Sequence, residues 1–104
     1  MKQAIAILTG GGPAPGMNTV VGSVAKTFLE KGYRVIGLHY GYSGLFNPSP
    51  RTEDLDFVKA DFIFNQGGSY LTMSRFKPTD KDFEENFNLS FFTENNVKLL
   101  VTVG

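Results

Sequence analysis

The chain has 104 residues, 41% hydrophobic and 19% charged, and these values are typical of a single small globular domain. Ten basic and ten acidic residues are scattered along the chain and give a formal net charge of zero, which argues against nucleic acid or an anionic membrane as a partner. With no cysteine, no secretory signal and no apolar run of membrane-spanning length, the sequence predicts a cytoplasmic protein without disulfides or thiolate metal sites.

The first predicted unit is a strand, a helix and a second strand. Residues 4–9 are an apolar run typical of a buried strand. In residues 17–31 apolar side chains recur at the spacing of one helical face, and Gly32 follows as a helix C-cap. Residues 33–39 read as a second buried strand. Together these segments predict a βαβ unit, and therefore an α/β fold with parallel strands.

The run GGGPAPGMN, at residues 10–18, joins the first strand to the helix. Glycine at the carboxyl end of a strand lets backbone N–H groups approach an anion, and the helix N-terminus adds unpaired donors and partial positive charge. The two prolines of the run fix φ at their positions, which preorganises the amides of Gly11, Gly12 and Ala14. We interpret the run as a phosphate cradle. The alternative is a tight turn that only lets the strand and helix pack.

Two common types of phosphate site do not fit this run. The third glycine of a dinucleotide fingerprint would fall at Pro15, and residues 34–39 end without the acidic residue that binds an adenosine ribose. A Walker A loop requires Lys and then Ser or Thr where this chain has Met17 and Asn18. The sequence therefore predicts neither an NAD site nor a P-loop, but a phosphate cradle of another type.

The middle of the chain gives weaker signals. Residues 40–50 are rich in Gly, Ser, Asn and Pro and predict a long loop. Residues 51–64 are ambiguous between a short strand and a helix, and we leave them unassigned. Residues 66–69 predict a second glycine turn.

A helix and a third strand are predicted in the last part of the chain. Residues 80–96 predict a helix whose stripe of Phe83, Phe87 and Phe91 packs on the sheet, because phenylalanines at helical spacing are usually core residues. Residues 99–103 predict a buried parallel strand. Three such strands leave a sheet edge and one helical layer incomplete, so we expect the front part of a larger fold.

Four motifs in this order and spacing resemble the N-terminal part of 6-phosphofructokinases. They are GGGPAPGMN, GYSGL at residues 41–45, GGSYLTMSRF at residues 67–76 and the closing LVTVG. The resemblance covers essentially the whole chain and implies a doubly wound, mostly parallel α/β sheet (Rossmann-like), incomplete in this chain. It also implies a homo-oligomeric enzyme of glycolysis that uses magnesium. Such an enzyme transfers a phosphoryl group from pyrophosphate or ATP to the 1-hydroxyl of fructose 6-phosphate.

The resemblance also implies roles for five residues. Gly12, with Gly11 beside it, would give a backbone amide to the donor phosphates. Arg75 would lie over these phosphates and neutralise charge on the transferred group, which is a catalytic role. Phe76 and Tyr42 would line the donor site. From the residues alone, Arg75 reads as a surface charge and both aromatic residues as packing residues.

Four positions depart from the allosteric bacterial ATP enzymes. Gly22 and Lys26 stand where the resemblance implies two effector-binding arginines, and Phe57 aligns with a third, so we expect that effector site to be absent. Pro13 stands where those enzymes carry aspartate. The resulting GGGPAPG form resembles branches that include pyrophosphate-dependent members, which slightly favours pyrophosphate as the donor.

The resemblance identifies residues 1–104 as the N-terminal portion of the phosphoryl-donor-binding domain, truncated before the catalytic aspartates. The metal-binding aspartate, the base and the fructose 6-phosphate contacts would all follow Gly104, so we expect this chain alone to be inactive and to hold no metal. Two alternatives remain: a non-catalytic phosphate-binding module, and one piece of a split enzyme. The only histidine, His39, reads as a strand-end residue without a catalytic role.

Overall fold

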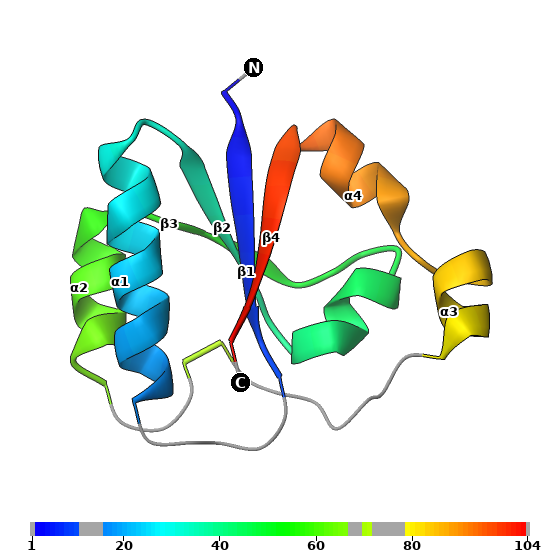
Figure 1. Ribbon diagram of the computed structural model, residues 1–104, viewed down its shortest axis with the longest axis horizontal. Helices are drawn as coiled ribbons and strands as arrows, with labels where there is room; N and C mark the ends of the chain where they lie inside the picture. Colours follow the sequence, from blue (N-terminus) through cyan, green and yellow to red (C-terminus); the bar gives the residue numbers. More distant parts are fainter. Residues whose placement is uncertain (1, 11–15, 67–69, 72–78, 104) are drawn as a thin grey trace.

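The described part of the chain folds into one sheet with helices on both faces (Figure 1). The computed structural model describes residues 2–10, 16–66, 70–71 and 79–103. Its elements, in chain order, are β1 (Ala4–Thr9), α1 (Met17–Glu30), β2 (Arg34–Leu38), the 3-10 helix η1 (Gly41–Phe46), β3 (Thr52–Leu55), α2 (Phe57–Phe64), α3 (Asp80–Glu85), α4 (Leu89–Glu94) and β4 (Val97–Val103).

The sheet has four strands in the order β3-β2-β1-β4. β1 lies between β2 and β4 and pairs in parallel with both, with Ile5 opposite Val35 on one side and Leu99 on the other. β3 pairs antiparallel with β2 and forms one edge. The mostly parallel α/β sheet predicted from the sequence is therefore confirmed, with an antiparallel edge strand that was not expected.

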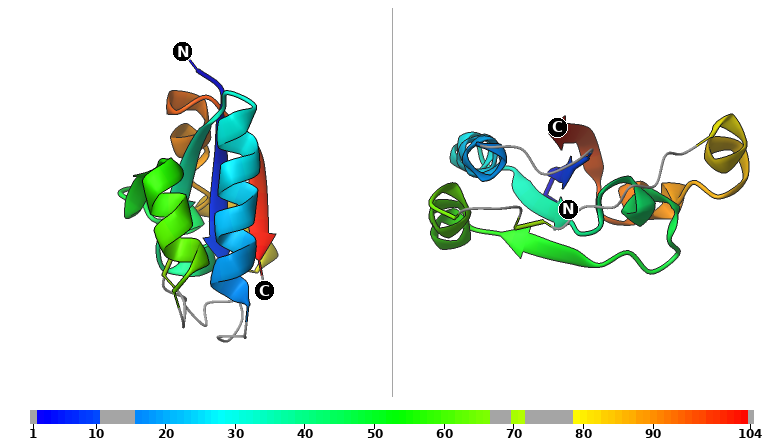
Figure 2. Two further views of the ribbon diagram at one scale, coloured as in Figure 1. Left: turned by 90° about the vertical axis from the view of Figure 1, so that its left-hand side faces the viewer. Right: turned by 90° about the horizontal axis from the view of Figure 1, so that it is seen from below.

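Each face of the sheet carries its own core, because successive strand residues point to opposite faces. Helices α1 and α2 cover one face, whereas η1 and α4 cover the other (Figure 2). Every residue of β1 is buried, as expected for a parallel strand that is covered on both sides. The first core is centred on Ile5, Ile7, Val21, Val35 and Ile63, and the second on Ala6, Leu8, Ile36, Leu38 and Phe91.

Residues 51–64, left unassigned from the sequence, hold both a strand and a helix. β3 and α2 are separated by a single residue, Asp56, whose carboxylate accepts a hydrogen bond of 2.8 Å from the Lys59 amide. This side chain caps the start of α2. The strand pattern and the helix pattern of this segment were therefore both correct. The N-cap residue Asp56 separates the two elements.

The helix predicted over residues 80–96 is instead two short helices, so that prediction was wrong in its extent. α3 ends at Glu85 with Asn86 as its C-cap, and Asn88 caps the start of α4 by accepting a 3.2 Å hydrogen bond from the Phe91 amide. Asparagine competes for backbone groups in this way and so favours helix ends. Of the predicted stripe only Phe91 is buried, while Phe83 is 51% exposed.

β4 begins at Val97, two residues before its predicted start, and is parallel as expected. The prediction of a buried strand was wrong, because β4 pairs only with β1 and Leu99 is 46% exposed. No strand of the described residues pairs with the other edge of β4.

The long loop predicted at residues 40–50 contains an ordered element, the 3-10 helix η1.

Helices α1 and α2 pack closely at Gly22. A Cβ atom at this position would lie 2.8 Å from the Phe64 Cβ and 2.9 Å from the Ala60 carbonyl oxygen. One turn further along α1, Lys26 forms a 2.7 Å ion pair with Asp61 of α2, with both side chains largely exposed. Such exposed pairs contribute about 0–1 kcal/mol, so the close helix contact and the buried core hold α2 in place.

We predict that Gly22→Ala lowers the free energy of unfolding by up to about 2 kcal/mol, since overpacking a tight contact costs about 1–3 kcal/mol and alanine's helix propensity returns about 1 kcal/mol. Urea unfolding measures the change. Ser23→Ala, at an exposed position of the same helix, is the matched control and should leave stability unchanged or slightly higher. A Gly22→Ala protein as stable as this control would contradict the close packing.

Candidate phosphate site at the carboxyl edge of the sheet

The carboxyl ends of β1 and β4 and the start of α1 lie at the same edge of the sheet, the lower edge in Figure 1. The Gly10 amide donates a 2.8 Å hydrogen bond to the Val103 carbonyl oxygen, so the pairing of β1 with β4 continues to the first residue of the glycine run. Thr9, the last residue of β1, is fully buried. The glycine run therefore leaves from a rigid strand end, as is usual for ligand sites of open α/β sheets.

Helix α1 begins after Gly16, which has φ of +81°. This left-handed conformation is strained for residues with a Cβ and explains the glycine. Gly16 offers no side chain to cap the helix, and the first turn has no acidic residue. The first-turn amides and the positive end of the helix dipole are therefore not neutralised by α1 itself, which favours an anion at this end.

Asn18, in the first turn of α1, connects the two glycine segments. Its side chain is buried, with 3% of the residue exposed. The Nδ2 atom donates a 3.1 Å hydrogen bond to the Gln66 carbonyl oxygen, and Oδ1 accepts a 2.9 Å bond from the Tyr70 amide. One amide therefore ties both Gln66 and Tyr70 to the start of α1. Residues 67–69 of the predicted second glycine turn lie outside the described residues.

Sequence patterns predict no such role for Asn18, which stands where a P-loop would require Ser or Thr. A signal was nevertheless present, because an asparagine in the first turn of a helix frequently hydrogen-bonds backbone groups. Its partners lie 48 and 52 residues further along the chain, beyond what local patterns can pair.

Among the five predicted site residues, Tyr42 is the one within the described part of the chain. Its ring packs on the second core and lies against Gly10, where a Cβ atom would approach the ring carbon Cε2 to 2.5 Å. Tyr42 therefore packs at the entrance of the glycine run, and a contact with a ligand stays a prediction. Gly11, Gly12, Arg75 and Phe76 lie outside the described residues.

A second polar cluster lies beside the second glycine turn and is centred on Glu53 of β3. The Glu53 Oε1 atom accepts a 2.7 Å hydrogen bond from the Tyr70 hydroxyl and lies 2.7 Å from the Lys59 Nζ atom. Its Oε2 atom lies 3.2 Å from Nε2 of His39, which is 8% exposed. Sequence patterns did not predict this cluster because Glu53 falls in the unassigned segment, residues 51–64. For the same reason they predicted no hydrogen-bond partner for His39.

The protonation states of this cluster follow from its contacts. Burial raises the pKa of the Glu53 carboxyl, but hydrogen bonds from Lys59, Tyr70 and His39 outweigh burial and hold the pKa below its ordinary value of 4.5. The hydrogen bond to Glu53, together with burial, raises the pKa of the Tyr70 hydroxyl above 10.0. Near neutral pH, Glu53 is therefore an ionised acceptor and Tyr70 a protonated donor.

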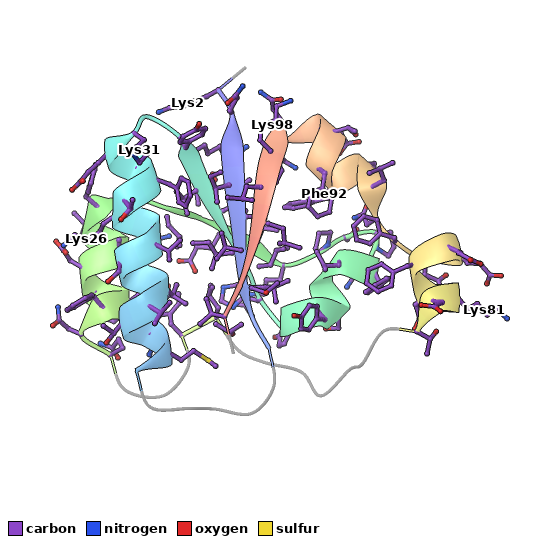
Figure 3. The ribbon with its side chains drawn as sticks, viewed as in Figure 1. Lys2, Lys26, Lys31, Lys81, Phe92 and Lys98 are labelled. Carbon is purple, nitrogen blue, oxygen red and sulfur yellow. The ribbon has the colours of Figure 1, made fainter. Side chains whose placement is uncertain are left out.

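Three of the lysines labelled in Figure 3 lie away from the candidate site. Lys2 and Lys98 are near the amino ends of β1 and β4, and Lys31 is at the carboxyl end of α1, all at the opposite edge of the sheet. Within residues 2–10, 16–66, 70–71 and 79–103 there is no group of three or more His, Cys, Asp or Glu side chains able to hold a metal ion. In the same ranges no helix is long and apolar enough to cross a membrane.

The positions aligned with effector arginines also have physical explanations. The close contact of α1 with α2 leaves no room for a longer side chain at Gly22. Lys26 is engaged by Asp61, and Phe57 is 45% exposed at the start of α2. These observations agree with the expected absence of that effector site, which stays a prediction.

Comparison with curated proteins finds relatives that use two different phosphoryl donors. The pyrophosphate–fructose 6-phosphate 1-phosphotransferase of Naegleria fowleri is 37% identical over 101 residues, which are 96% of this chain and 23% of that protein. The ATP-dependent 6-phosphofructokinase of Edwardsiella ictaluri is 42% identical over 104 residues, which are the whole of this chain and 32% of that protein. The chain thus spans 32% or less of the length of these two relatives.

Solved structures and a family model agree with these relatives. The crystal structure of Pichia pastoris phosphofructokinase in the T-state superposes with a TM-score of 0.84 at 27% identity, over 98% of this chain and 11% of that one. The phosphofructokinase of Saccharomyces cerevisiae, at 23% identity and a TM-score of 0.82, has the same fold over 97% of this chain and 14% of its own. The family model described as phosphofructokinase matches residues 4–104. This chain belongs to the phosphofructokinase family.

Proposed function

We propose that residues 1–104 form the N-terminal portion of the phosphoryl-donor-binding domain of a 6-phosphofructokinase. That enzyme transfers a phosphoryl group from pyrophosphate or ATP to fructose 6-phosphate in glycolysis. One observation supports this proposal most directly. In a chain of this family, the buried Asn18 side chain ties Gln66 and Tyr70 to the start of α1. These two residues flank residues 67–69, which begin the second segment that the resemblance assigns to the donor.

The proposed chemistry divides between backbone and side chains. The amides of Gly11 and Gly12 bind the donor phosphates beside the uncapped end of α1. Arg75 neutralises the charge that develops on the transferred group, while Tyr42 and Phe76 line the donor site. Magnesium would neutralise the donor phosphates, and its ligands would come from outside the described residues, which hold no suitable cluster. We further propose a cytoplasmic homo-oligomer, as the family resemblance implies.

A non-catalytic phosphate-binding module is the second candidate. It is favoured by the absence, among the described residues, of a cluster of carboxylate and histidine side chains that could hold the metal. A piece of a split enzyme would show the same absence. The phosphate-binding module and the split enzyme both keep the phosphate cradle. They differ from the 6-phosphofructokinase proposal because in neither does one longer polypeptide with these residues perform the reaction.

The test is an assay of the longest natural polypeptide that contains these residues, with fructose 6-phosphate, magnesium and either ATP or pyrophosphate. We expect fructose 1,6-bisphosphate with at least one donor, and none from the 104-residue chain alone, because the base and the acceptor site lie elsewhere. Phosphate binding without product would favour the module. Comparable product from the short chain would show that the catalytic groups are misplaced.

We predict that Gly12→Val in this longest polypeptide raises the donor KM more than the KM of fructose 6-phosphate, because a Cβ atom blocks backbone approach to the phosphates. Steady-state kinetics with each substrate varied measures both constants. Thr19→Val, an exposed position in the first turn of α1, is the matched control and should behave as the wild type. Unchanged donor KM and kcat in Gly12→Val would contradict the assignment.

We predict that Arg75→Ala lowers kcat about 100-fold or more, with a smaller change in donor affinity, since a cation over the transferred group acts mainly in the transition state. Single-turnover kinetics at saturating donor separates the two effects. Lys77→Ala, which removes a nearby cation of the same segment, serves as the control. Near-normal turnover of Arg75→Ala would return this residue to an ordinary surface charge.

A further inference from the structure

Tyr70 and Leu71, which stand between the second glycine turn and the segment that carries Arg75, are held by three separate contacts. The Tyr70 amide donates to the Asn18 Oδ1 atom at 2.9 Å, and the Tyr70 hydroxyl donates to Glu53 at 2.7 Å. Leu71 is fully buried. Its side chain fills the space above Gly37, where a Cβ atom would approach Leu71 Cδ2 to 2.6 Å.

The hydrogen bond from the Tyr70 hydroxyl depends on the position of the Glu53 side chain. Glu53 lies opposite Gly37 in the register of β3 with β2, so its side chain is on the same face as Leu71 and α2. The side chain is 19% exposed, and Lys59 and His39 engage the carboxylate from two further elements. Hydrogen bonds from three residues fix both oxygens, and the carboxylate is a rigid acceptor for the Tyr70 hydroxyl.

We infer that Glu53 is a positioning residue for the phosphoryl-donor site. Through the Tyr70 hydroxyl it holds the chain that links the second glycine turn to the Arg75 segment against β2 and α1. The inference rests on the proposed function, because it assigns the held segment to donor binding. Glu53 itself touches no substrate, and its effect on the reaction passes through Tyr70.

A simple packing role for Tyr70 makes a different prediction. Its ring centroid lies 6.1 Å from that of Phe62 and 6.2 Å from that of His39, and these ring contacts do not need the hydroxyl. Tyr70→Phe keeps the ring and removes the bond to Glu53. Glu53→Gln keeps a side-chain oxygen that accepts from Tyr70, whereas Glu53→Ala removes the acceptor. These three variants separate the hydrogen bond from the packing.

We expect Tyr70→Phe and Glu53→Ala, made in the longest natural polypeptide that contains these residues, each to raise the donor KM about five- to tenfold, the effect of losing one such hydrogen bond. The KM of fructose 6-phosphate should stay within about twofold. Glu53→Gln should restore most of the donor affinity. The double variant should be no worse than either single one, because both remove the same bond. Lys31→Ala, which removes an exposed lysine at the opposite edge of the sheet, is the control and should leave both KM values unchanged.

Two results would overturn the inference. One is an equal change in both KM values, accompanied by a lower Tm, which indicates a merely structural role. The other is donor kinetics of Tyr70→Phe that match the wild type. Hydrogen exchange at the Tyr70 and Leu71 amides adds a readout without catalysis, and we expect faster exchange in Glu53→Ala. If the wild-type protein transfers no phosphoryl group, the proposed function is contradicted. If hydrogen exchange at the Tyr70 and Leu71 amides is then unchanged in Glu53→Ala, the inference is contradicted as well.

Discussion

The buried side chain of Asn18 is the contact on which the candidate site depends. It satisfies a carbonyl oxygen at Gln66 and an amide at Tyr70, and both of its own polar atoms are thereby paired. Leaving such buried groups without partners costs about 1–3 kcal/mol each, so the arrangement is strongly specified. Because Asn18 is itself fixed in the first turn of α1, Gln66 and Tyr70 are held beside the start of this helix.

Ion pairs of the described residues join neighbouring elements of the fold. Two cations of the described residues pair with carboxylates on neighbouring elements, Lys26 with Asp61 and Arg34 with Asp54 at 2.8 Å. Lys59 is engaged in the same way by Glu53. The Lys26–Asp61 and Arg34–Asp54 pairs are exposed and stabilise the fold little, whereas the Glu53 side chain is 19% exposed. Under the proposed function, backbone amides, the start of α1 and Arg75 are the partners of a polyphosphate.

The elements predicted correctly from the sequence are those with uninterrupted patterns. The apolar runs of β1 and β2 reflect burial on both faces of the sheet, and the helical periodicity of α1 reflects burial of one helix face against it. β3, with sequence TEDL, buries only Leu55 and gives almost no strand pattern. The two asparagines between α3 and α4 end one helix and start the next, which periodicity does not detect. Asn18 and Glu53 were missed because their partners are distant along the chain.

The most direct test of this account is a crystal structure of the longest natural polypeptide that contains these residues, grown with magnesium and pyrophosphate. We expect phosphate oxygens at about 3 Å from the amides of Gly11 and Gly12, beside the start of α1. The hydrogen bonds of Asn18 to Gln66 and Tyr70 should remain intact in that complex. A diphosphate bound elsewhere, with the start of α1 empty, would contradict the assignment of this edge as the donor site.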